Sequence, residues 1–409
     1  MKHLSIIILF LFIASTKANQ IISIPILYFK GSFEIQLSIG RSEVCQFKQI
    51  DLQFPFLWTT PLYFSESITS KIINSKVFKY DGKEYSTLMY KDKLRLYTNS
   101  KEFITLDDFD ILLIKDKTIY GEHRDSIGFD IDSNEQSSLV YQLKRNNFID
   151  KLSFAIIPTS NNRGIISFGG LPYNTIPDRK YKTHISITKN KWGASLDTMY
   201  IIYPKDSISI LQNTISKTPY YYDYNDVAYF QLNKYEISIP SSFMKFLKEK
   251  SFFKIFKGMK LCFYTNKEGI EAIDCLYIAL RDLPKSIVFV INGKPFKMKF
   301  SELFICDRNK CRFQMIHHKN KELFEFGTLF MSKYTTLYDI EDKSITFYSN
   351  EAFINKLSIS ESFTKRFLFI MIFVLSLVSL SLLVIRRKYI KHSINTNHRS
   401  SDNFDLMDL

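Results

Sequence analysis

The sequence is short of glycine and has no Asn-x-Ser/Thr sequon. Only 13 of its 409 residues are glycine, which is few for a chain rich in strand-like patterns. Without a sequon, N-glycosylation is not expected. A basic stripe is also missing, because the Lys and Arg residues behind the formal net charge of +14 are scattered along the chain. Scattered basic residues indicate a solvated surface, so nucleic-acid binding is not expected.

Short stretches that alternate apolar and polar residues run through the middle of the chain. Examples are FEIQLSI at 33–39, SIVFVI at 286–291 and SITFY at 344–348. A period of two is typical of β-strands. The apolar content of 45% is enough to fill two hydrophobic cores. The sequence therefore predicts an all-β unit of roughly 320 residues in two lobes.

Both ends of the sequence carry hydrophobic segments typical of membrane targeting. Residues 1–18 combine basic residues, an apolar run and a small-residue end, which predicts a secretory signal peptide. Residues 367–385 have no charge and are long enough to cross the hydrocarbon core as a helix. The basic cluster that begins at Arg386 is typical of the cytosolic side. We therefore expect a single-pass type I membrane protein of the secretory pathway, at the cell surface or in an endomembrane or lysosome-like compartment.

The segments that flank the predicted span differ in character. Residues 351–366 form a juxtamembrane linker, and residues 386–409 form a cytoplasmic tail. The tail ends in SSDNFDLMDL, in which acidic residues are interleaved with Phe, Leu and Met. Two interpretations remain open: a sorting signal read by a cytosolic adaptor, or a disordered tail.

Two loops within the all-β region have related spacings. In the first, Asp51 stands seven residues before Trp58, and in the second, Gln231 stands nine residues before Pro240. Both loops resemble the catalytic loops of pepsin-like aspartic proteases, which read Asp-Thr/Ser-Gly and carry a Trp or a Pro at these spacings. The resemblance implies a bilobal pepsin-like fold with one loop in each lobe.

Other segments stand in the order of the same family. They are YFKGSFEIQLSIG at 28–40, YDGKEYSTLMYKDKLRL at 80–96, DSIGFD at 125–130, KWGASLDTMYI at 191–201 and FEFGTLFMSKYTTLYDIEDKSITFYS at 324–349. The second of these resembles the flap hairpin and has Tyr80 at the flap tyrosine position. The resemblance implies an N-terminal lobe at 19–190, a C-terminal lobe at 191–350, and a peptide or protein ligand in the cleft between them.

The residues that define the family's active site are the ones that differ. In the family, two carboxylates about 3 Å apart cannot both ionise, so they share one proton. Gln231 is an amide, which forms hydrogen bonds but cannot hold that proton. Asp51 alone is then expected to be a structural hydrogen-bond acceptor. The Thr and Gly partners that tie the family's loops together are also replaced, by Leu52, Gln53, Leu232 and Asn233, so we expect loops without a cross-tie.

Three functions remain open on this sequence. One is a pseudoprotease that is catalytically impaired or inactive and binds peptides or proteins through the cleft. Another is an active aspartic endopeptidase with an aberrant dyad, or one in which a nearby acid, Asp223 or Asp226, supplies the second carboxylate. The third is a structural surface protein that uses the fold only as a stable body. No cofactor is expected.

Four of the five cysteines lie in the second predicted lobe: Cys262, Cys275, Cys306 and Cys311. In an oxidising compartment they predict two disulfides. Four cysteines allow three connectivities, and the family resemblance implies a bridge from Cys275 to Cys306 or Cys311. Cys45 is expected to be a buried, reduced thiol. A metal site that combines cysteines with His317 and His318 is not favoured, since the flanking pattern is not zinc-like.

Overall fold

The structure of the protein is a computed structural model. It describes residues 21–29, 31–40, 45–53, 57–59, 71–80, 83–98, 102–114, 126–131, 138–159, 162–172, 182–188, 191–202, 220–319 and 321–349. The predicted signal peptide, juxtamembrane linker, membrane span and cytoplasmic tail all lie outside these ranges. Within them, no helix is both long and apolar enough to cross a membrane.

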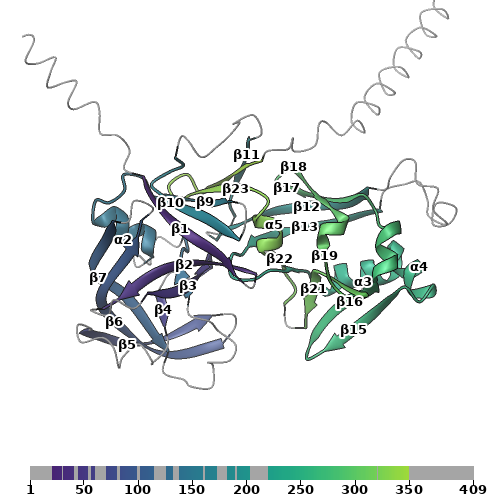
Figure 1. The fold of residues 1–409 in the computed structure, drawn as a ribbon, viewed down its shortest axis with the longest axis horizontal. Helices are drawn as coiled ribbons and strands as arrows, with labels where there is room; N and C mark the ends of the chain where they lie inside the picture. The colour runs from purple at the N-terminus through teal and green to yellow at the C-terminus, as the bar shows by residue number, and fades with distance from the viewer. Residues whose placement is uncertain are drawn as a thin grey trace, which may run out of the picture. The chain divides into compact units, whose positions relative to one another are not determined.

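Strands dominate the described chain and form two large sheets (Figure 1). The strands of the first sheet are β1 (Ile22–Phe29), β2 (Ser32–Ile39), β3 (Gln46–Asp51), β4 (Leu57–Thr59), β5 (Lys71–Tyr80), β6 (Lys83–Tyr97), β7 (Phe103–Ile114), β8 (Ser126–Gly128), β9 (Ser153–Pro158), β10 (Arg163–Phe168), β11 (Lys182–Ser186), β23 (Thr335–Asp339) and β24 (Ser344–Tyr348). They run in the order β11-β24-β23-β9-β10-β1-β2-β3-β8-β4-β7-β6-β5. Helix α2 (Leu139–Arg145) packs against this sheet through its buried leucines.

The second sheet is built from the strands between β11 and β23. They are β12 (Gly193–Ile202), β13 (Tyr220–Phe230), β14 (Ile237–Ser238), β15 (Cys262–Lys267), β16 (Ile270–Leu276), β17 (Ser286–Ile291), β18 (Lys294–Lys299), β19 (Phe304–Asp307), β20 (Lys310–Phe313), β21 (Met315–His318) and β22 (Phe324–Phe326). The order is β18-β17-β12-β13-β22-β14-β21-β16-β20-β19, with β15 paired to β16. The helices here are α3 (Ser241–Lys250), α4 (Phe252–Gly258) and α5 (Thr328–Met331), with 3-10 turns η5 (Tyr277–Asp282) and η6 (Phe300–Leu303).

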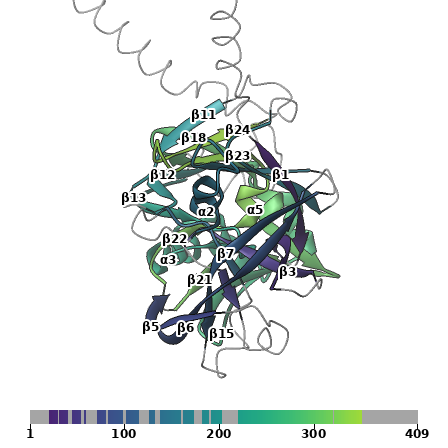
Figure 2. The ribbon, with the colours of Figure 1, turned by 90° about the vertical axis from the view of Figure 1, so that its left-hand side faces the viewer.

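The end of the described chain returns to the first sheet. Strands β23 and β24 fall in the range predicted for the C-terminal lobe, yet β23 pairs with β9. Strand β24 pairs with β11, and Figure 2 shows β11, β24 and β23 close together. Three buried rings pack at this junction. Phe154 and Tyr338 stack with centroids 4.6 Å apart, and Trp192 meets Tyr338 edge-on at 5.0 Å. The two lobes therefore share one continuous hydrophobic core.

Both lobes thread a loop around a short strand in the same way. In the first, β3 runs parallel to β8, β8 antiparallel to β4, and β4 parallel to β7. In the second, β13, β22, β14 and β21 repeat these pairings strand for strand. Asp51 is in register with Gly128, and because Phe230 is in register with Phe326, the next residue, Gln231, falls opposite Gly327. The repeat therefore makes Asp51 and Gln231 equivalent positions.

Two disulfides form, but the pairing implied by the family resemblance was wrong. Cys262 bonds to Cys275 and Cys306 bonds to Cys311, in place of a bridge from Cys275 to Cys306 or Cys311. Hairpin register is the reason, because β15–β16 and β19–β20 place the bonded residues directly opposite each other. Cys45 takes part in neither bridge, and it is half-buried before β3 rather than fully buried.

Candidate functional site

The first loop begins where β3 ends, at Asp51, whose surface is 3% exposed. Its carbonyl oxygen accepts a hydrogen bond from the N–H of Phe129 at 2.8 Å, which ties the strand end to the chain after β8. Its carboxylate turns back onto its own loop, where Oδ1 accepts from the N–H of Gln53 at 2.9 Å. This is the local bond that Asp favours in turns. This bond uses only Oδ1, so Oδ2 of Asp51 can accept from a donor outside the first loop.

The second loop supplies a donor to that oxygen. Nδ2 of Asn233 donates to Oδ2 of Asp51 at 3.1 Å, so an amide from the second lobe faces the buried carboxylate. In the other direction, Nε2 of Gln53 donates to the carbonyl oxygen of Phe230 at 3.3 Å. The expectation of loops without a cross-tie was therefore wrong. Two amide side chains bond between the lobes where pepsin-like proteases use hydroxyls.

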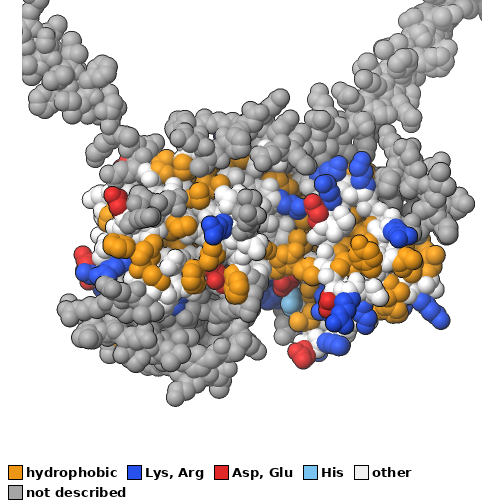
Figure 3. Space-filling model, in the orientation of Figure 1, with side chains coloured by type: hydrophobic (Ala, Val, Ile, Leu, Met, Phe, Trp, Pro, Cys, Tyr) orange, Lys and Arg blue, Asp and Glu red, His pale blue; other side chains and the backbone are white. Residues whose placement is uncertain are grey.

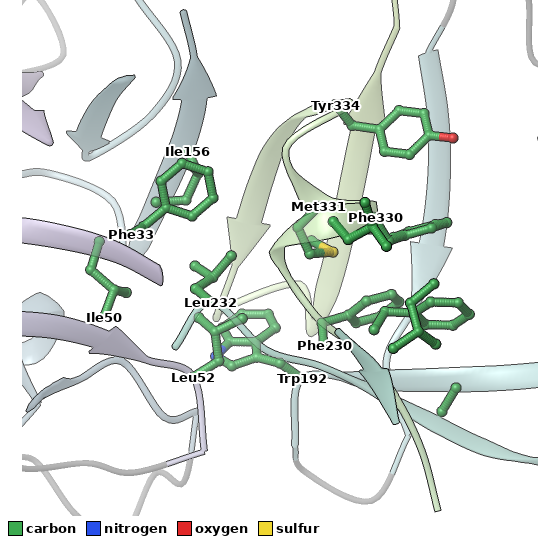
Figure 4. Packing of buried hydrophobic residues seen from close by; sticks show 14 of the residues in the cluster. Phe33, Ile50, Leu52, Ile156, Trp192, Phe230, Leu232, Phe330, Met331 and Tyr334 are labelled. Carbon is green, nitrogen blue, oxygen red and sulfur yellow. The ribbon is translucent and has the colours of Figure 1, made fainter. Parts of the chain in front are cut away.

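The middle residues of the two loops are buried leucines. Leu52 and Leu232 have no exposed surface and belong to one hydrophobic cluster, and Figure 4 shows them beside Trp192. Nε1 of Trp192 donates to the carbonyl oxygen of Phe129 at 2.7 Å. The N–H of Phe33 donates to the carbonyl oxygen of Leu232 at 2.9 Å. Because burying each leucine contributes about 1.5–3 kcal/mol, apolar packing also holds the loops together.

Gln231 takes the place in the second lobe that Asp51 takes in the first. Its N–H donates to the carbonyl oxygen of Phe326 at 2.9 Å, and the residue is 6% exposed. Within the described part of the chain, its Oε1 is buried without a hydrogen-bond partner. An unmet buried acceptor costs about 1–3 kcal/mol. Among the described residues, this oxygen is therefore an unmet acceptor inside the fold.

The sequence matches the model of a known family over more than half of its length. The model describes the eukaryotic aspartyl protease family, and the match covers residues 126–349. The chain belongs to the eukaryotic aspartyl protease family. The family and the two-lobed all-β fold predicted from the sequence are thereby confirmed.

Solved structures share this aspartyl protease fold at low sequence identity. The aspartic proteinase from Irpex lacteus has a TM-score of 0.56 at 16% identity, over 80% of this chain and 97% of its own. Basic 7S globulin from soybean has a TM-score of 0.61 at 11% identity, over 82% of this chain and 96% of its own. No curated protein matches the sequence. At these identities, the likeness to solved structures shows the fold alone.

Further contacts between the lobes lie next to the second loop, and the sequence did not suggest them. Oγ1 of Thr328 donates to the carbonyl oxygen of Gly31 at 2.7 Å and lies 3.3 Å from the hydroxyl of Tyr28. Gly31 has a φ of +87°, and a Cβ there would lie 2.5 Å from Cβ of Tyr235. Only glycine permits this approach. Gly31 is the sequence feature that points to this contact, because glycine is rare in this chain and a glycine often marks a close approach of two backbones.

Charged side chains lie next to the second loop. Lys234, which follows Asn233, forms a largely buried ion pair with Glu325 on β22. Oε1 of Glu236 lies 3.4 Å from Nε2 of His318. Burial alone would raise the pKa of Glu236, but bonds from His318 and the backbone and the charge of Lys234 together lower it. Figure 3 shows acidic, basic and histidine side chains close together near the middle of one face.

The structure keeps the two alternative acids away from the first loop. Asp223 and Asp226 are exposed on β13, and Oδ1 of Asp226 accepts from the N–H of Val227 at 2.7 Å. A strand rises about 3.3 Å per residue, which puts Asp226 roughly 16 Å before Gln231. Neither carboxylate is therefore brought to Asp51.

The predicted flap corresponds to the hairpin of β5 and β6. Tyr80 ends β5 and pairs with Lys83 across the hairpin. The side chains of Tyr80 and Trp58 lie outside the described part of the structure. The flap role of Tyr80 therefore stays a prediction.

Proposed function

We propose that this protein is a membrane-anchored, catalytically impaired or inactive member of the eukaryotic aspartyl protease family that binds peptides or proteins between its lobes. One observation carries the proposal: the amide of Asn233 faces Oδ2 of Asp51, 3.1 Å away. Gln231, at the position equivalent to Asp51, is an amide as well. The two second-loop side chains at these positions are therefore both amides.

The chemistry of paired acids explains why an amide matters here. Two carboxylates that share a proton divide the work, since the ionised one activates water and the protonated one polarises the scissile carbonyl. An amide forms hydrogen bonds but does not titrate. With Asn233 bonded to Oδ2, that edge of Asp51 adjoins a group that cannot exchange a proton with it. Water activation and carbonyl polarisation would then lack one of their two acids.

Peptide binding does not depend on a shared proton. An extended peptide is held by main-chain hydrogen bonds and by pockets for alternate side chains. The contact between Asn233 and Asp51 supports this role, because it holds the two loops together where the family resemblance implies a ligand. The β5–β6 hairpin supports it too, as a flap that could close over an extended chain.

The proposed membrane anchor rests on the sequence. Residues 367–385 are uncharged and of spanning length, and residues 1–18 read as a signal peptide. This topology would put the ligand-binding lobes on the extracellular or lumenal side. The tail at 386–409 would lie in the cytosol, where an adaptor could bind its acidic and apolar residues.

The test measures cleavage and binding with the purified full-length protein. We expect no acid-optimum cleavage of a peptide library above that of Asp51→Ala. We also expect weak affinity for pepstatin-like inhibitors, because their hydroxyl sits between two acids. Peptides should still bind in fluorescence anisotropy. The variant Asp51→Asn, which keeps the shape of the side chain, is the matched control.

Two results would overturn the proposal in different directions. Cleavage that Asp51→Ala and Asp51→Asn both abolish would identify an active endopeptidase with an aberrant dyad. A protein that neither cleaves nor binds any member of the library would favour a structural surface protein.

A further inference from the structure

The four cysteines of the second lobe lie in one row across four strands. Cys262 on β15 stands opposite Cys275 on β16, Cys275 stands opposite Cys311 on β20, and Cys311 stands opposite Cys306 on β19. Residues directly opposite in antiparallel strands point to the same face of the sheet. The four sulfur atoms therefore share one face, in the order Cys262, Cys275, Cys311, Cys306.

The disulfides occupy the two ends of this cysteine row. The Cα atoms are 4.0 Å apart in Cys262–Cys275 and 3.9 Å apart in Cys306–Cys311, so both are close, non-hydrogen-bonded pairs. In an antiparallel sheet, the N–H and C=O of one residue both point toward the same neighbouring strand. Cys275 and Cys311 each form a close pair with their bonded partner, so they form the wide, hydrogen-bonded pair with each other. The Cα atoms of Cys275 and Cys311 are then about 5.5 Å apart. This lies within the roughly 4.4–6.8 Å that a disulfide spans.

Burial singles out one cysteine for attack from solution. Cys262, Cys275 and Cys311 are at most 1% exposed, whereas Cys306 is exposed. Cys306 is therefore the first of the four cysteines that a thiol in solution reaches, and the sulfur that attack there displaces is that of Cys311. The displaced thiolate lies beside Cys275.

We propose that the cysteine row is a thiol–disulfide exchange site that passes reduction inward from Cys306 to Cys262. The thiolate of a dithiol reductant bonds to Cys306, and Cys311 leaves. Cys311 then bonds to Cys275, and Cys262 leaves and takes up the proton that the reductant lost. In such an exchange a thiolate attacks one sulfur of a disulfide and displaces the other, and the order of the row puts Cys311 on the side of Cys275 away from Cys262.

The second thiol of the reductant completes the exchange. It attacks the mixed disulfide, closes a cyclic disulfide within the reductant, and releases Cys306, which takes up the second proton. One dithiol is oxidised, and two bridges become one bridge, Cys275–Cys311, with thiols at Cys262 and Cys306. The original bridges each close one hairpin. The new bridge instead joins hairpin β15–β16 to hairpin β19–β20.

Disulfide mapping tests the proposal, because each cysteine of the row lies in its own tryptic peptide. The folded full-length protein is treated with less than one equivalent of dithiothreitol, blocked with N-ethylmaleimide and digested without further reduction. We expect mass spectrometry to find Cys275 linked to Cys311, with Cys262 and Cys306 blocked. An intact Cys262–Cys275 bridge, with Cys306 and Cys311 both blocked, would overturn the proposal.

Two matched variants break the same bridge and leave different thiols. Cys306→Ser leaves Cys311 beside Cys275, so the Cys275–Cys311 bridge should form without reductant and Cys262–Cys275 should be lost. Cys311→Ser leaves Cys306, which is two strands from Cys275, so Cys262–Cys275 should persist. The same pairing in both variants would contradict the exchange. If either variant fails to fold, the titration of the unaltered protein decides.

Discussion

The two loops follow the same path through their lobes, but different chemistry holds them in place. The first keeps an acid, Asp51, whose carboxylate bonds to the backbone of its own loop. The second carries amides, and an ion pair between Lys234 and Glu325 braces it from one side. The shared threading of strands therefore fixes where the loops meet, while the side chains at the meeting point are free to change.

The lobes also differ in how their outer parts are secured. Within the described residues, both disulfides lie in the second lobe, in hairpins that pack on a cluster of phenylalanine rings. In that cluster Phe253 and Phe300 lie 5.0 and 5.5 Å from Phe313, centroid to centroid. Disulfides therefore stabilise the second lobe, whereas the buried acid Asp51 lies in the first.

The difference between the two loops is tested most strongly by giving the second loop an acid. Asn233→Asp would put a carboxylate at the place where the amide now lies 3.1 Å from Oδ2 of Asp51. Two carboxylates this close cannot both ionise, so the pKa of one is raised above its unfolded value. A raised carboxyl pKa costs stability above the unfolded pKa and costs nothing below it. Urea unfolding should show a deficit relative to the unaltered protein that grows by roughly 3–4 kcal/mol from about pH 4 to pH 7.

The matched control for that variant removes the hydrogen bond without adding charge. Asn233→Ala should lose about 1–2 kcal/mol at both pH values. If Asn233→Asp shows the same pH-independent loss, the two loops do not meet at Asp51 and Asn233.

Removing each disulfide in turn tests whether the bridges stabilise the second lobe alone. The bridges close segments with sequence separations of 13 and 5. By loop entropy, the Cys262→Ala/Cys275→Ala variant should lose about 3 kcal/mol and Cys306→Ala/Cys311→Ala about 2 kcal/mol. Hydrogen exchange should rise in β15–β20 and stay unchanged in β1–β7. Faster exchange in the first lobe would mean that the bridges support both lobes.

Strand patterns and loop spacing predicted the architecture, because alternation and turn chemistry are local properties. The cysteine pairing was also within reach of the sequence. Glu268 and Gly269 both have positive φ, 53° and 79°, as a two-residue hairpin turn requires. Positions equidistant from that turn face each other, which sets Cys262 against Cys275. The family resemblance implied a different bridge for Cys275, which the register of this hairpin excludes.

The partner of Asp51 was not predictable in the same way. Asn233 stands two residues beyond the position that the family uses, and its amide reaches Asp51 only because the lobes bring the loops together. The same holds for Thr328, which bonds to Gly31 almost three hundred residues earlier in the chain. Such contacts depend on tertiary geometry, for which one sequence carries no local pattern.

A double-mutant cycle tests whether the buried leucines sit where hydroxyls could tie the loops. Leu52→Thr and Leu232→Thr should each destabilise the protein, since each buries a hydroxyl and loses apolar contact. In the double variant the two hydroxyls could bond to each other. Urea unfolding should then give a coupling energy of about 1 kcal/mol in favour of the double variant. Additive losses would show that the two side chains do not meet.

The smallest expected effect concerns the oxygen that the second loop leaves unmet. Gln231→Leu removes a buried acceptor without a partner among the described residues and keeps a side chain of similar size. The free energy of unfolding should therefore rise, by about 1 kcal/mol. Gln231→Glu is the matched control: it keeps an oxygen in place but buries a charge, so stability should fall at neutral pH. A loss of stability from Gln231→Leu would show that this oxygen has a hydrogen-bond partner in the folded protein.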